Sequence, residues 1–345
     1  MTSLSIAKCL EGARGRGASD LHLGAGVAAF LRVEGEIERL GDAAMGSGEA
    51  EGICRELCAL GGVEAGSDVD FCFEMEGLGR FRVNQHRTAR GLAASIKCIP
   101  LHVPTLEELG LPEELGQLTY YRTGMVLVTG PAGCGKSSTL AALLQQINAT
   151  RREHVVTIED PIEFVFRSEK CNVTQRQVGP HTRSFGAALR AALREDPDIV
   201  LVSELRGLDA IRTAVVAAET GHLVLGTLHT SDAAATVNRL IDLFPTEEQD
   251  QIRSMVAASL RTVVSQRLLP RAGGGRRVPA YEILHVNPAV AKLIRDGRAH
   301  QIPSQLQLGR KQGMIDLDAR LAEMVEGGLI TVETARDHAH NPARF

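Results

Sequence analysis

The sequence predicts an α/β protein in which a parallel sheet with helices on both faces follows a small α+β domain. From Met125 onward, short apolar runs typical of buried strands alternate with helical segments. Before residue 100 the pattern is different, because two helical segments are interspersed with short alternating runs. A chain of 345 residues is long enough for both domains, since single cores rarely grow past roughly 250–300 residues.

The first domain is expected to span residues 1–99. Helices are predicted at Leu4–Glu11 and Glu49–Leu60. Strands are predicted at Leu21–Leu23, within Phe30–Leu40, and at Val69–Met75, Gly79–His86 and Leu92–Ile99. Pro100 and Pro104 then interrupt the pattern, so residues 100–124 are predicted to be a linker with short helices.

The second domain is expected to cover residues 125–345. Its strands are predicted at Met125–Thr129, His154–Ile158, Ile199–Val202, Leu223–Gly226 and Val278–Leu284. The Ala- and Leu-rich stretch Lys136–Asn148 is predicted to be a helix. Thr246 and Gln249 have the spacing of a capping box, which predicts a helix ending near Leu260. Residues 288–345 are expected to form several short helices.

Composition and charge narrow the functional classes. Hydrophobic residues make up 44% and charged residues 23%, as in ordinary globular proteins. No run approaches the ~18 apolar residues of a membrane span, and charges at Lys8 and Glu11 argue against an export signal. We therefore expect a cytoplasmic protein whose seven cysteines are reduced thiols. The net charge of −4 and the pI of about 6.3 argue against a nucleic-acid partner.

The segment Gly130-Pro-Ala-Gly-Cys-Gly-Lys-Ser137 has the spacing of a phosphate-binding loop between a strand and a helix. Its glycines allow backbone N–H groups to surround phosphates, Lys136 supplies a positive charge, and the Ser137 hydroxyl can ligate Mg²⁺. With this composition, about 0.006 matches are expected by chance. The predicted ligands are ATP and Mg²⁺, and the predicted nucleotide-binding residues are Gly130, Pro131, Ala132, Gly133, Cys134, Gly135, Lys136, Ser137 and Ser138.

Cys134 lies inside this loop, next to the amino terminus of the predicted helix. That environment tends to lower the pKa of a thiol. We therefore expect alkylation of Cys134 to slow ATP turnover and bound ATP to protect against it.

Carboxylates follow two of the predicted strands. Glu159, Asp160 and Glu163 form one acidic segment, in which Glu159 and Asp160 are predicted to share Mg²⁺ with the loop serine. Glu204 follows the strand of four apolar residues and is predicted to be the general base that orients water toward the γ-phosphate. The alternatives are a solvated acidic loop and a surface glutamate paired with Arg206.

His222 and His229 flank a short apolar run. Because they are seven residues apart on a predicted strand, they should point to opposite faces. One histidine is expected to sense the γ-phosphate while the other holds the surrounding structure. A purely structural role for both is the alternative, since a lone histidine in a strand is usually structural.

Several ordered motifs, taken together, resemble the secretion and pilus motor ATPases, and most closely the twitching-motility retraction ATPases of the PilT type. The resemblance covers nearly the whole chain. The matching segments are Ala18–Leu23, Leu31–Glu36, Gly79–Asn84, Asp160–Glu163, Asp196–Arg206, Gly221–Thr230, Ser265–Pro270 and Gly297–Ile302.

This resemblance implies an ATP-hydrolysing homohexamer that drives retraction of type IV pili. Each subunit would have a PAS-like amino-terminal domain and a RecA-like ATPase domain, with ATP between them. The implied partner is an inner-membrane pilus platform protein, and the implied location is the inner face of that membrane. The resemblance also implies catalytic roles for Glu163 and Glu204, and γ-phosphate sensing or coupling by His222 and His229. Four arginines in matching segments are candidate nucleotide contacts, with ordinary salt bridges as the alternative: Arg80, Arg82, Arg176 and Arg190.

Two segments depart from the family pattern. Gly207 stands where relatives generally carry an acid, and the segment Ala289–Asp296 keeps its apolar positions but replaces an arginine and an asparagine. Because the latter segment is associated with retraction, the departure concerns mechanical coupling more than hydrolysis.

Three alternative functions remain. A pilus-assembly or type II secretion motor would generally carry a four-cysteine zinc element, but Arg271–Arg277 occupies that position and only Cys134 and Cys171 follow residue 124. A DNA-dependent RecA-like motor is disfavoured by the acidic pI. A ring component that binds but does not hydrolyse ATP would not need Glu204.

Overall fold

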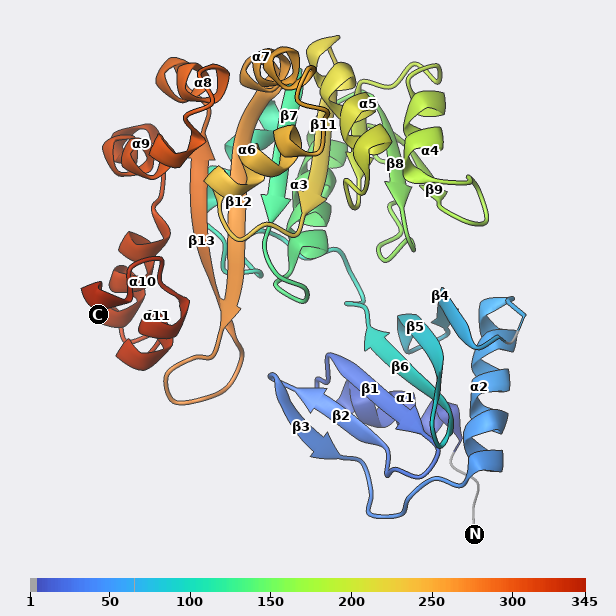
Figure 1. Cartoon of the computed structure of the whole chain (residues 1–345). Helices are drawn as coiled ribbons and strands as arrows, with labels where there is room; N and C mark the ends of the chain where they lie inside the picture. Colours follow the sequence, from blue (N-terminus) through green and yellow to red (C-terminus); the bar gives the residue numbers. More distant parts are fainter. Residues whose placement is uncertain (1–4, 65) are drawn as a thin grey trace. The chain divides into compact units, whose positions relative to one another are not determined.

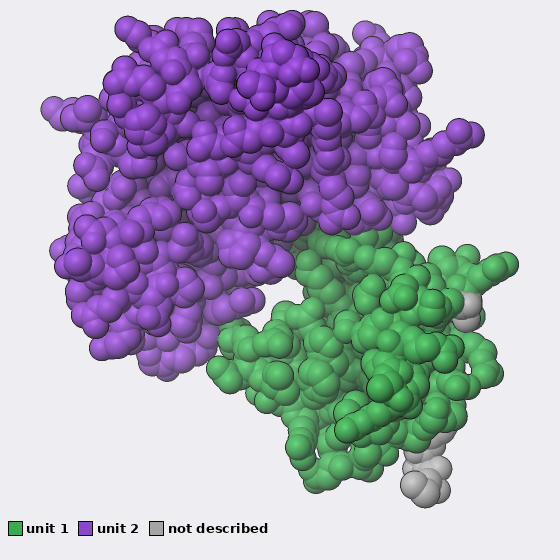
Figure 2. Space-filling model, viewed as in Figure 1, with its two compact units in different colours: residues 1–102, 161–164 green, residues 103–160, 165–345 purple. Residues whose placement is uncertain are grey.

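The computed structural model describes residues 5–64 and 66–345, which form two compact units (Figures 1 and 2). The first unit comprises the residues up to His102 together with the short segment Pro161–Phe164. The second unit comprises Val103–Asp160 and Val165–Phe345. The sequence placed a boundary near residue 100 but did not predict that residues 161–164 belong to the first unit. Within the described ranges, no helix has the length and apolar character needed to cross a membrane.

The described part of the first unit is an antiparallel sheet with the strand order β3-β2-β1-β6-β5-β4. The strands are β1 (Asp20–Gly24), β2 (Phe30–Val33), β3 (Glu36–Arg39), β4 (Asp68–Met75), β5 (Gly79–Thr88) and β6 (Gly91–Cys98). The helices α1 (Ile6–Gly15) and α2 (Ser47–Gly61) contribute apolar side chains to the same buried cluster as these strands. Alternate residues such as Phe81 and Val83 on β5 lie in this core, while Arg80 and Arg82 point to the other face. Leu4, where the first predicted helix begins, lies outside the described residues.

The second unit contains a sheet with the strand order β13-β12-β7-β11-β10-β8-β9 (Figure 1). Neighbouring strands are parallel except for the β12–β13 hairpin, so the sheet is mixed rather than wholly parallel. The bounds are β7 (Gly124–Thr129), β8 (His154–Glu159), β9 (Asn172–Gln177), β10 (Ile199–Val202), β11 (Leu223–Leu228), β12 (Leu260–Leu269) and β13 (Val278–His285). The sequence did not predict β9, which is an edge strand of mostly polar residues, or β12, whose apolar run is interrupted by polar side chains.

Helices cover both faces of this sheet. On β7, Met125 and Leu127 join the core on one side, and Val126 and Val128 join the core on the other. This alternation explains why the strand is entirely apolar. The α-helices of the unit are α3 (Lys136–Thr150), α4 (Phe185–Ala192), α5 (Leu208–Glu219), α6 (Ala233–Asp242), α7 (Gln249–Ser259), α8 (Pro288–Arg295), α9 (Ile302–Leu308), α10 (Leu317–Glu326) and α11 (Val332–His338).

The segment before β7 is packed structure rather than a linker. It contains the 3₁₀ helix η1 (Glu113–Tyr120), whose side chains Leu115 and Leu118 are buried in the same cluster as Val126 and Leu140. The leucines that follow the prolines therefore belong to the core of the second unit.

The predicted capping box of α7 is not formed. The helix begins after Glu248, which provides no side-chain cap. The Gln249 side chain instead donates a hydrogen bond to the carbonyl of Phe244 at 3.1 Å. A local four-residue pattern was therefore overridden by the preceding turn.

Candidate nucleotide-binding and catalytic site

The glycine-rich loop, residues Gly130–Ser137, joins β7 to α3 at the carboxyl end of the sheet. Gly130 has a φ of 138°, and a Cβ built there would lie 2.2 Å from the backbone oxygen of Gln266. The close approach of β12 therefore requires glycine at this position. The Gln266 side chain also donates to the Cys134 carbonyl at 2.6 Å and accepts from Thr139 at 2.9 Å. These contacts hold the loop against β12.

Lys136 lies within the turn that this loop makes. Its side chain is buried, with the residue only 8% exposed, and Nζ donates to the carbonyls of Gly130 and Pro131, both at 2.9 Å. The same nitrogen is 3.3 Å from Nδ1 of His229. Ser137 is exposed at the start of α3, and Ser138 is half-buried. The loop thus places a cation and an accessible hydroxyl at the amino terminus of a helix, where anions are favoured.

Glu204 and His229 join Lys136 in one cluster. Glu204 lies two residues beyond β10, and its Oε1 is 3.5 Å from Nε2 of His229, the residue that follows β11. Glu204 also pairs with Arg206 at 3.1 Å, so the proposed surface ion pair does form. It forms beside the loop, however, and the imidazole of His229 connects the loop lysine to the acid.

His222 lies at the opposite end of β11. Its carbonyl accepts from the N–H of Gly124 at 2.9 Å, and its ring Nδ1 is 3.0 Å from the carbonyl of Ala217. Seven residues of extended chain, roughly 20 Å, separate it from His229. The structure therefore does not bring His222 to the cluster formed by the loop, and its hydrogen bonds to Gly124 and Ala217 are structural ones.

Glu159 and Asp160 follow β8. Glu159 is buried and accepts hydrogen bonds from Thr157 at 2.6 Å and Gln175 at 2.9 Å, whereas Asp160 is exposed. Within the described residues, no group of three or more His, Cys, Asp or Glu side chains is arranged to hold a metal ion. Mg²⁺ beside a nucleotide needs no such cage, because it keeps waters and binds phosphates with one or two protein oxygens. Ser137, Glu159 and Asp160 supply oxygen atoms of the kind that Mg²⁺ prefers, and their assignment as its ligands stays a prediction.

Glu163 lies among cations of the first unit. It is 8% exposed, and Oε1 is 3.2 Å from both Nη1 of Arg82 and Nζ of Lys97. Lys97 is also 3.3 Å from Oε2. Arg80 donates two hydrogen bonds to the backbone carbonyl of Ile162, at 2.9 and 3.1 Å. The sequence missed Lys97, although its alternation with apolar neighbours on β6 places it on the same face as Arg82.

Arg82 has a second acidic partner, Asp70, at 2.7 Å. Burial lowers the pKa of Arg82, but the hydrogen bond to Asp70 and the charges of Asp70 and Glu163 outweigh burial and raise the pKa overall. The guanidinium is therefore fixed between two carboxylates in this conformation.

Arg176 and Arg190 both form salt bridges within the second unit. Arg176 on β9 pairs with Glu195, and Arg190 on α4 pairs with Asp209. These contacts are the alternative that the sequence left open for the two residues. Their assignment as nucleotide contacts stays a prediction.

The predicted lowering of the pKa of the Cys134 thiol is wrong. The residue is only 3% exposed, and burial raises the pKa of its thiol, although Lys136 and backbone hydrogen bonds act in the other direction. Burial outweighs the helix terminus because the thiolate would lose its hydration. The thiol is therefore protonated and shielded at neutral pH, and we no longer expect it to be reactive.

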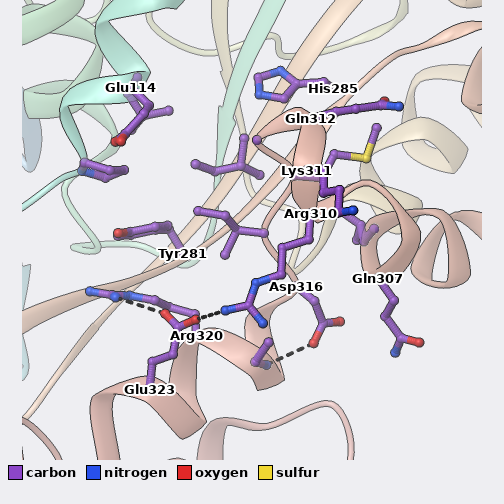
Figure 3. A pocket seen from close by; sticks show the side chains of 18 of the residues that line it. Glu114, Tyr281, His285, Gln307, Arg310, Lys311, Gln312, Asp316, Arg320 and Glu323 are labelled. Atoms are coloured by element: carbon purple, nitrogen blue, oxygen red, sulfur yellow. Dashed lines mark hydrogen bonds and ion pairs between the residues drawn. The ribbon is translucent and has the colours of Figure 1, made fainter. Parts of the chain in front are cut away.

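A cavity of about 960 Å³ lies elsewhere in the second unit, between η1, β13 and α10 (Figure 3). It shares no lining residue with the glycine-rich loop. Glu323 pairs there with Arg310 at 2.7 Å and Arg320 at 3.4 Å, and the Arg320 guanidinium lies over the ring of Tyr281 (Figure 3). Choosing the candidate site by cavity volume alone would therefore miss the residues of the glycine-rich loop.

Comparison with known proteins decides the family. Residues 80–310 match the family described as Type II/IV secretion system protein. The chain is 46% identical over 345 residues to the type IV pilus retractation ATPase PilT of Pseudomonas aeruginosa, covering 99% of this chain and 100% of that protein. The chain belongs to this family. It is also 51% identical over 274 residues to a twitching motility protein of Neisseria gonorrhoeae, covering 79% of this chain and 73% of that one.

Solved structures agree with this assignment. The crystal structure titled as the pilus retraction motor PilT with bound ADP has a TM-score of 0.84 to this chain, at 40% identity and 99% coverage of each chain. The resemblance to retraction ATPases of the PilT type is thereby confirmed, as is membership of an ATPase family.

Proposed function

We propose that this protein hydrolyses ATP with Mg²⁺ at the glycine-rich loop and uses the energy to retract type IV pili. The observation that carries the proposal is the cluster formed by Lys136, His229 and Glu204 at the end of the sheet. The cluster joins a phosphate-binding cation to a carboxylate through an imidazole. Relatives named for retraction and twitching motility over most of the chain support the biological role.

The residues of the loop cluster have distinct chemical roles in this proposal. Backbone N–H groups of the loop and Nζ of Lys136 bind and orient the phosphates. Mg²⁺, held by Ser137 with Glu159 or Asp160, would neutralise charge on the β- and γ-phosphate oxygens. Glu204 orients the attacking water and takes its proton.

His229 gives the cluster a way to report the state of the nucleotide. Its Nδ1 is 3.3 Å from Lys136, and its Nε2 is 3.5 Å from Glu204. A γ-phosphate that draws Lys136 toward itself would change the first contact, and the imidazole would pass that change to the acid. Exposure of the His229 side chain, 50%, leaves it room to move.

We also propose the finer features that the family resemblance implies. The strand–loop–helix arrangement at β7 and α3 supports a RecA-like P-loop domain, and the sheet with two helices in the first unit supports a PAS-like domain. A homohexamer acting on an inner-membrane platform protein from the cytoplasmic side follows from the same resemblance. The β12–β13 connection contains three consecutive glycines, Gly273–Gly275, with φ of 84–86°, and this tight turn supports a retraction motor over a motor with a zinc element.

The test is ATP turnover by the purified full-length chain, with Lys136→Ala as the matched variant. We expect magnesium-dependent phosphate release by the wild type and a loss of about 10³-fold in the variant, because a cation that stabilises transferring phosphate is removed. In cells lacking the gene, pili should extend but not retract, and the Lys136→Ala gene should not restore retraction. Absence of turnover by the wild type under every assembly condition would overturn the proposal.

A further inference from the structure

Glu282 on β13 is a buried acid that the chemistry at the glycine-rich loop does not use. The residue is 3% exposed, and its Oε1 accepts a hydrogen bond from the backbone N–H of Ala233 at 2.9 Å. Ala233 is the first residue of α6 and is itself buried. The first N–H groups of a helix lack partners within the helix, and a carboxylate is favoured beside them. Glu282 therefore caps α6 from a neighbouring strand.

The helix that Glu282 caps follows His229 closely in the chain. Thr230, Ser231 and Asp232 alone connect His229 to α6. The hydroxyl oxygens of Thr230 and Thr236 are 2.6 Å apart, which joins this connection to the helix. The Asp232 side chain accepts a hydrogen bond from the N–H of Ala235 at 2.7 Å. The backbone position of His229 is therefore tied to that of the first turns of α6.

His229 depends on this backbone support because its side chain is half-exposed. Its ring nitrogens lie 3.3 Å from Nζ of Lys136 and 3.5 Å from Oε1 of Glu204. Both distances exceed those of ordinary hydrogen bonds, so a small further displacement of the ring would break one of the contacts. Surrounding side chains do not enclose the imidazole, and the backbone that carries it must therefore set its position.

The second oxygen of Glu282 faces the carboxy-terminal end of the chain. Oε2 lies 3.6 Å from Nε2 of His340, which follows α11. Asp318 on α10 holds the same segment, because it accepts hydrogen bonds from the backbone N–H groups of His340 at 2.7 Å and Asn341 at 2.9 Å. Glu282 thus contacts both α6 and the segment after α11, whereas Asp318 holds that segment. Substitutions at the two acids can separate these contacts.

We propose that Glu282 is a positioning residue for His229. Its hydrogen bond to the N–H of Ala233 fixes the start of α6, and α6 holds His229 between Lys136 and Glu204. The inference rests on the proposed function, in which His229 reports the state of the nucleotide. Without this acceptor the buried N–H would be unpaired, which is costly, so the start of α6 would shift until the N–H reached water. His229 would move with it.

The experiment uses variants of the full-length protein that remove either side of this hydrogen bond. Glu282→Ala removes the acceptor, and Glu282→Gln retains an oxygen that can accept. Ala233→Pro removes the donor, and proline is tolerated at the first position of a helix. The preceding Asp232 is already extended, with φ −156° and ψ 173°, as a residue before proline should be. Asp318→Ala is the control, because it loosens the segment after α11 and leaves the bond to Ala233 in place.

The measured quantities are kcat, the KM for ATP, the melting temperature, and the ratio of affinities for a non-hydrolysable ATP analogue and ADP. We expect Glu282→Ala and Ala233→Pro each to lower kcat by about 10- to 100-fold, the effect of a misplaced group, while KM changes little. Preference for the analogue should fall about fivefold. Glu282→Gln and Asp318→Ala should retain kcat, although Asp318→Ala lowers the melting temperature. The double variant should lose no more than either single variant, because both remove one bond.

Unchanged kcat and analogue preference in folded Glu282→Ala and Ala233→Pro would overturn the proposal. An equal loss of kcat in Asp318→Ala would also overturn it, because loosening of the carboxy-terminal segment would then be the cause. If Glu282→Ala does not fold, Ala233→Pro decides. If the wild type does not hydrolyse ATP, the proposed function fails, and the affinity ratio tests the positioning separately. A preference for the analogue that Glu282→Ala or Ala233→Pro lowers would then still support it.

Discussion

Glu204 and Glu163 are both acids that follow a predicted strand, yet their surroundings differ. Glu204 in the second unit contacts a histidine at 3.5 Å and an exposed arginine, and its side chain is 26% exposed. Glu163 in the first unit has a side-chain exposure of 10% and lies 3.2 Å from two cations, Arg82 and Lys97. One acid is accessible and joined to the loop cluster, and the other is enclosed and neutralised.

This difference distinguishes Glu204, a candidate general base, from Glu163, which has a structural role in this conformation. A general base must have a free oxygen within reach of water, and Glu204 meets that requirement in this conformation. The oxygens of Glu163 are occupied by ion pairs, while Arg80 holds the neighbouring Ile162 carbonyl. The catalytic role predicted for Glu163 therefore requires that these pairs first exchange for others. In this conformation Glu163 fixes residues 161–164 to the sheet of the first unit.

The largest effect is expected at the accessible acid. Glu204→Gln keeps the shape of the side chain but cannot accept a proton, so turnover should fall by ~10² or more. Binding of ATP should be retained, since Lys136 and the loop are untouched. Phosphate release and equilibrium nucleotide binding measure the two quantities on the same preparation. Unchanged turnover would show that Glu204 is not the base, and its greater exposure relative to Glu163 would then not indicate a catalytic role.

A smaller effect on turnover is expected at the enclosed acid. Glu163→Gln leaves Arg82 and Lys97 without their shared charge, so we expect turnover to fall by about tenfold or less and stability to fall by about 1–2 kcal/mol. Urea unfolding and turnover are measured together. Glu74→Gln is the control, because Glu74 is an exposed acid on β4 of the same sheet. If Glu163→Gln reduces turnover as much as Glu204→Gln and leaves stability intact, Glu163 is a catalytic residue and its structural interpretation is wrong.

The same comparison shows how much the sequence could predict. The loop, Lys136 and Glu204 were predictable because their functions depend on local spacing and on the strand that precedes each segment. The contact of Lys97 with Glu163 and the contact of His229 with Glu204 were not predictable, because each joins residues many positions apart. Burial also reversed the expected pKa shift of Cys134, since a local pattern near a helix terminus does not reveal how much water reaches the thiol. Polar edge strand β9 lacked the apolar signal on which strand prediction depends.

A third acid, Glu282, is also buried and extends the comparison, because one of its partners can lose its charge near neutral pH. Glu282 on β13 is 3% exposed, accepts a hydrogen bond from the N–H of Ala233 at 2.9 Å, and lies 3.6 Å from Nε2 of His340. The interaction with Glu282 raises the pKa of His340 above 6.5. Burial and Arg267 lower that pKa, and Asp232 raises it further.

The smallest expected effect is a pH-dependent loss of stability in His340→Gln. Because folding raises the pKa of His340, its contribution is fully present below pH 6.5 and is lost as the pH rises through the folded-state pKa. The side chain is 38% exposed, so we expect about 0.5–1 kcal/mol at pH 6 and no difference from the wild type at pH 9, by urea unfolding. His300→Gln, at an exposed histidine, is the control. The stability loss of Glu163→Gln should instead be similar at the two pH values, because the raised pKa of Arg82 keeps that partner charged throughout this range. Equal losses for His340→Gln at the two pH values would mean that packing, and not charge, holds His340 against Glu282.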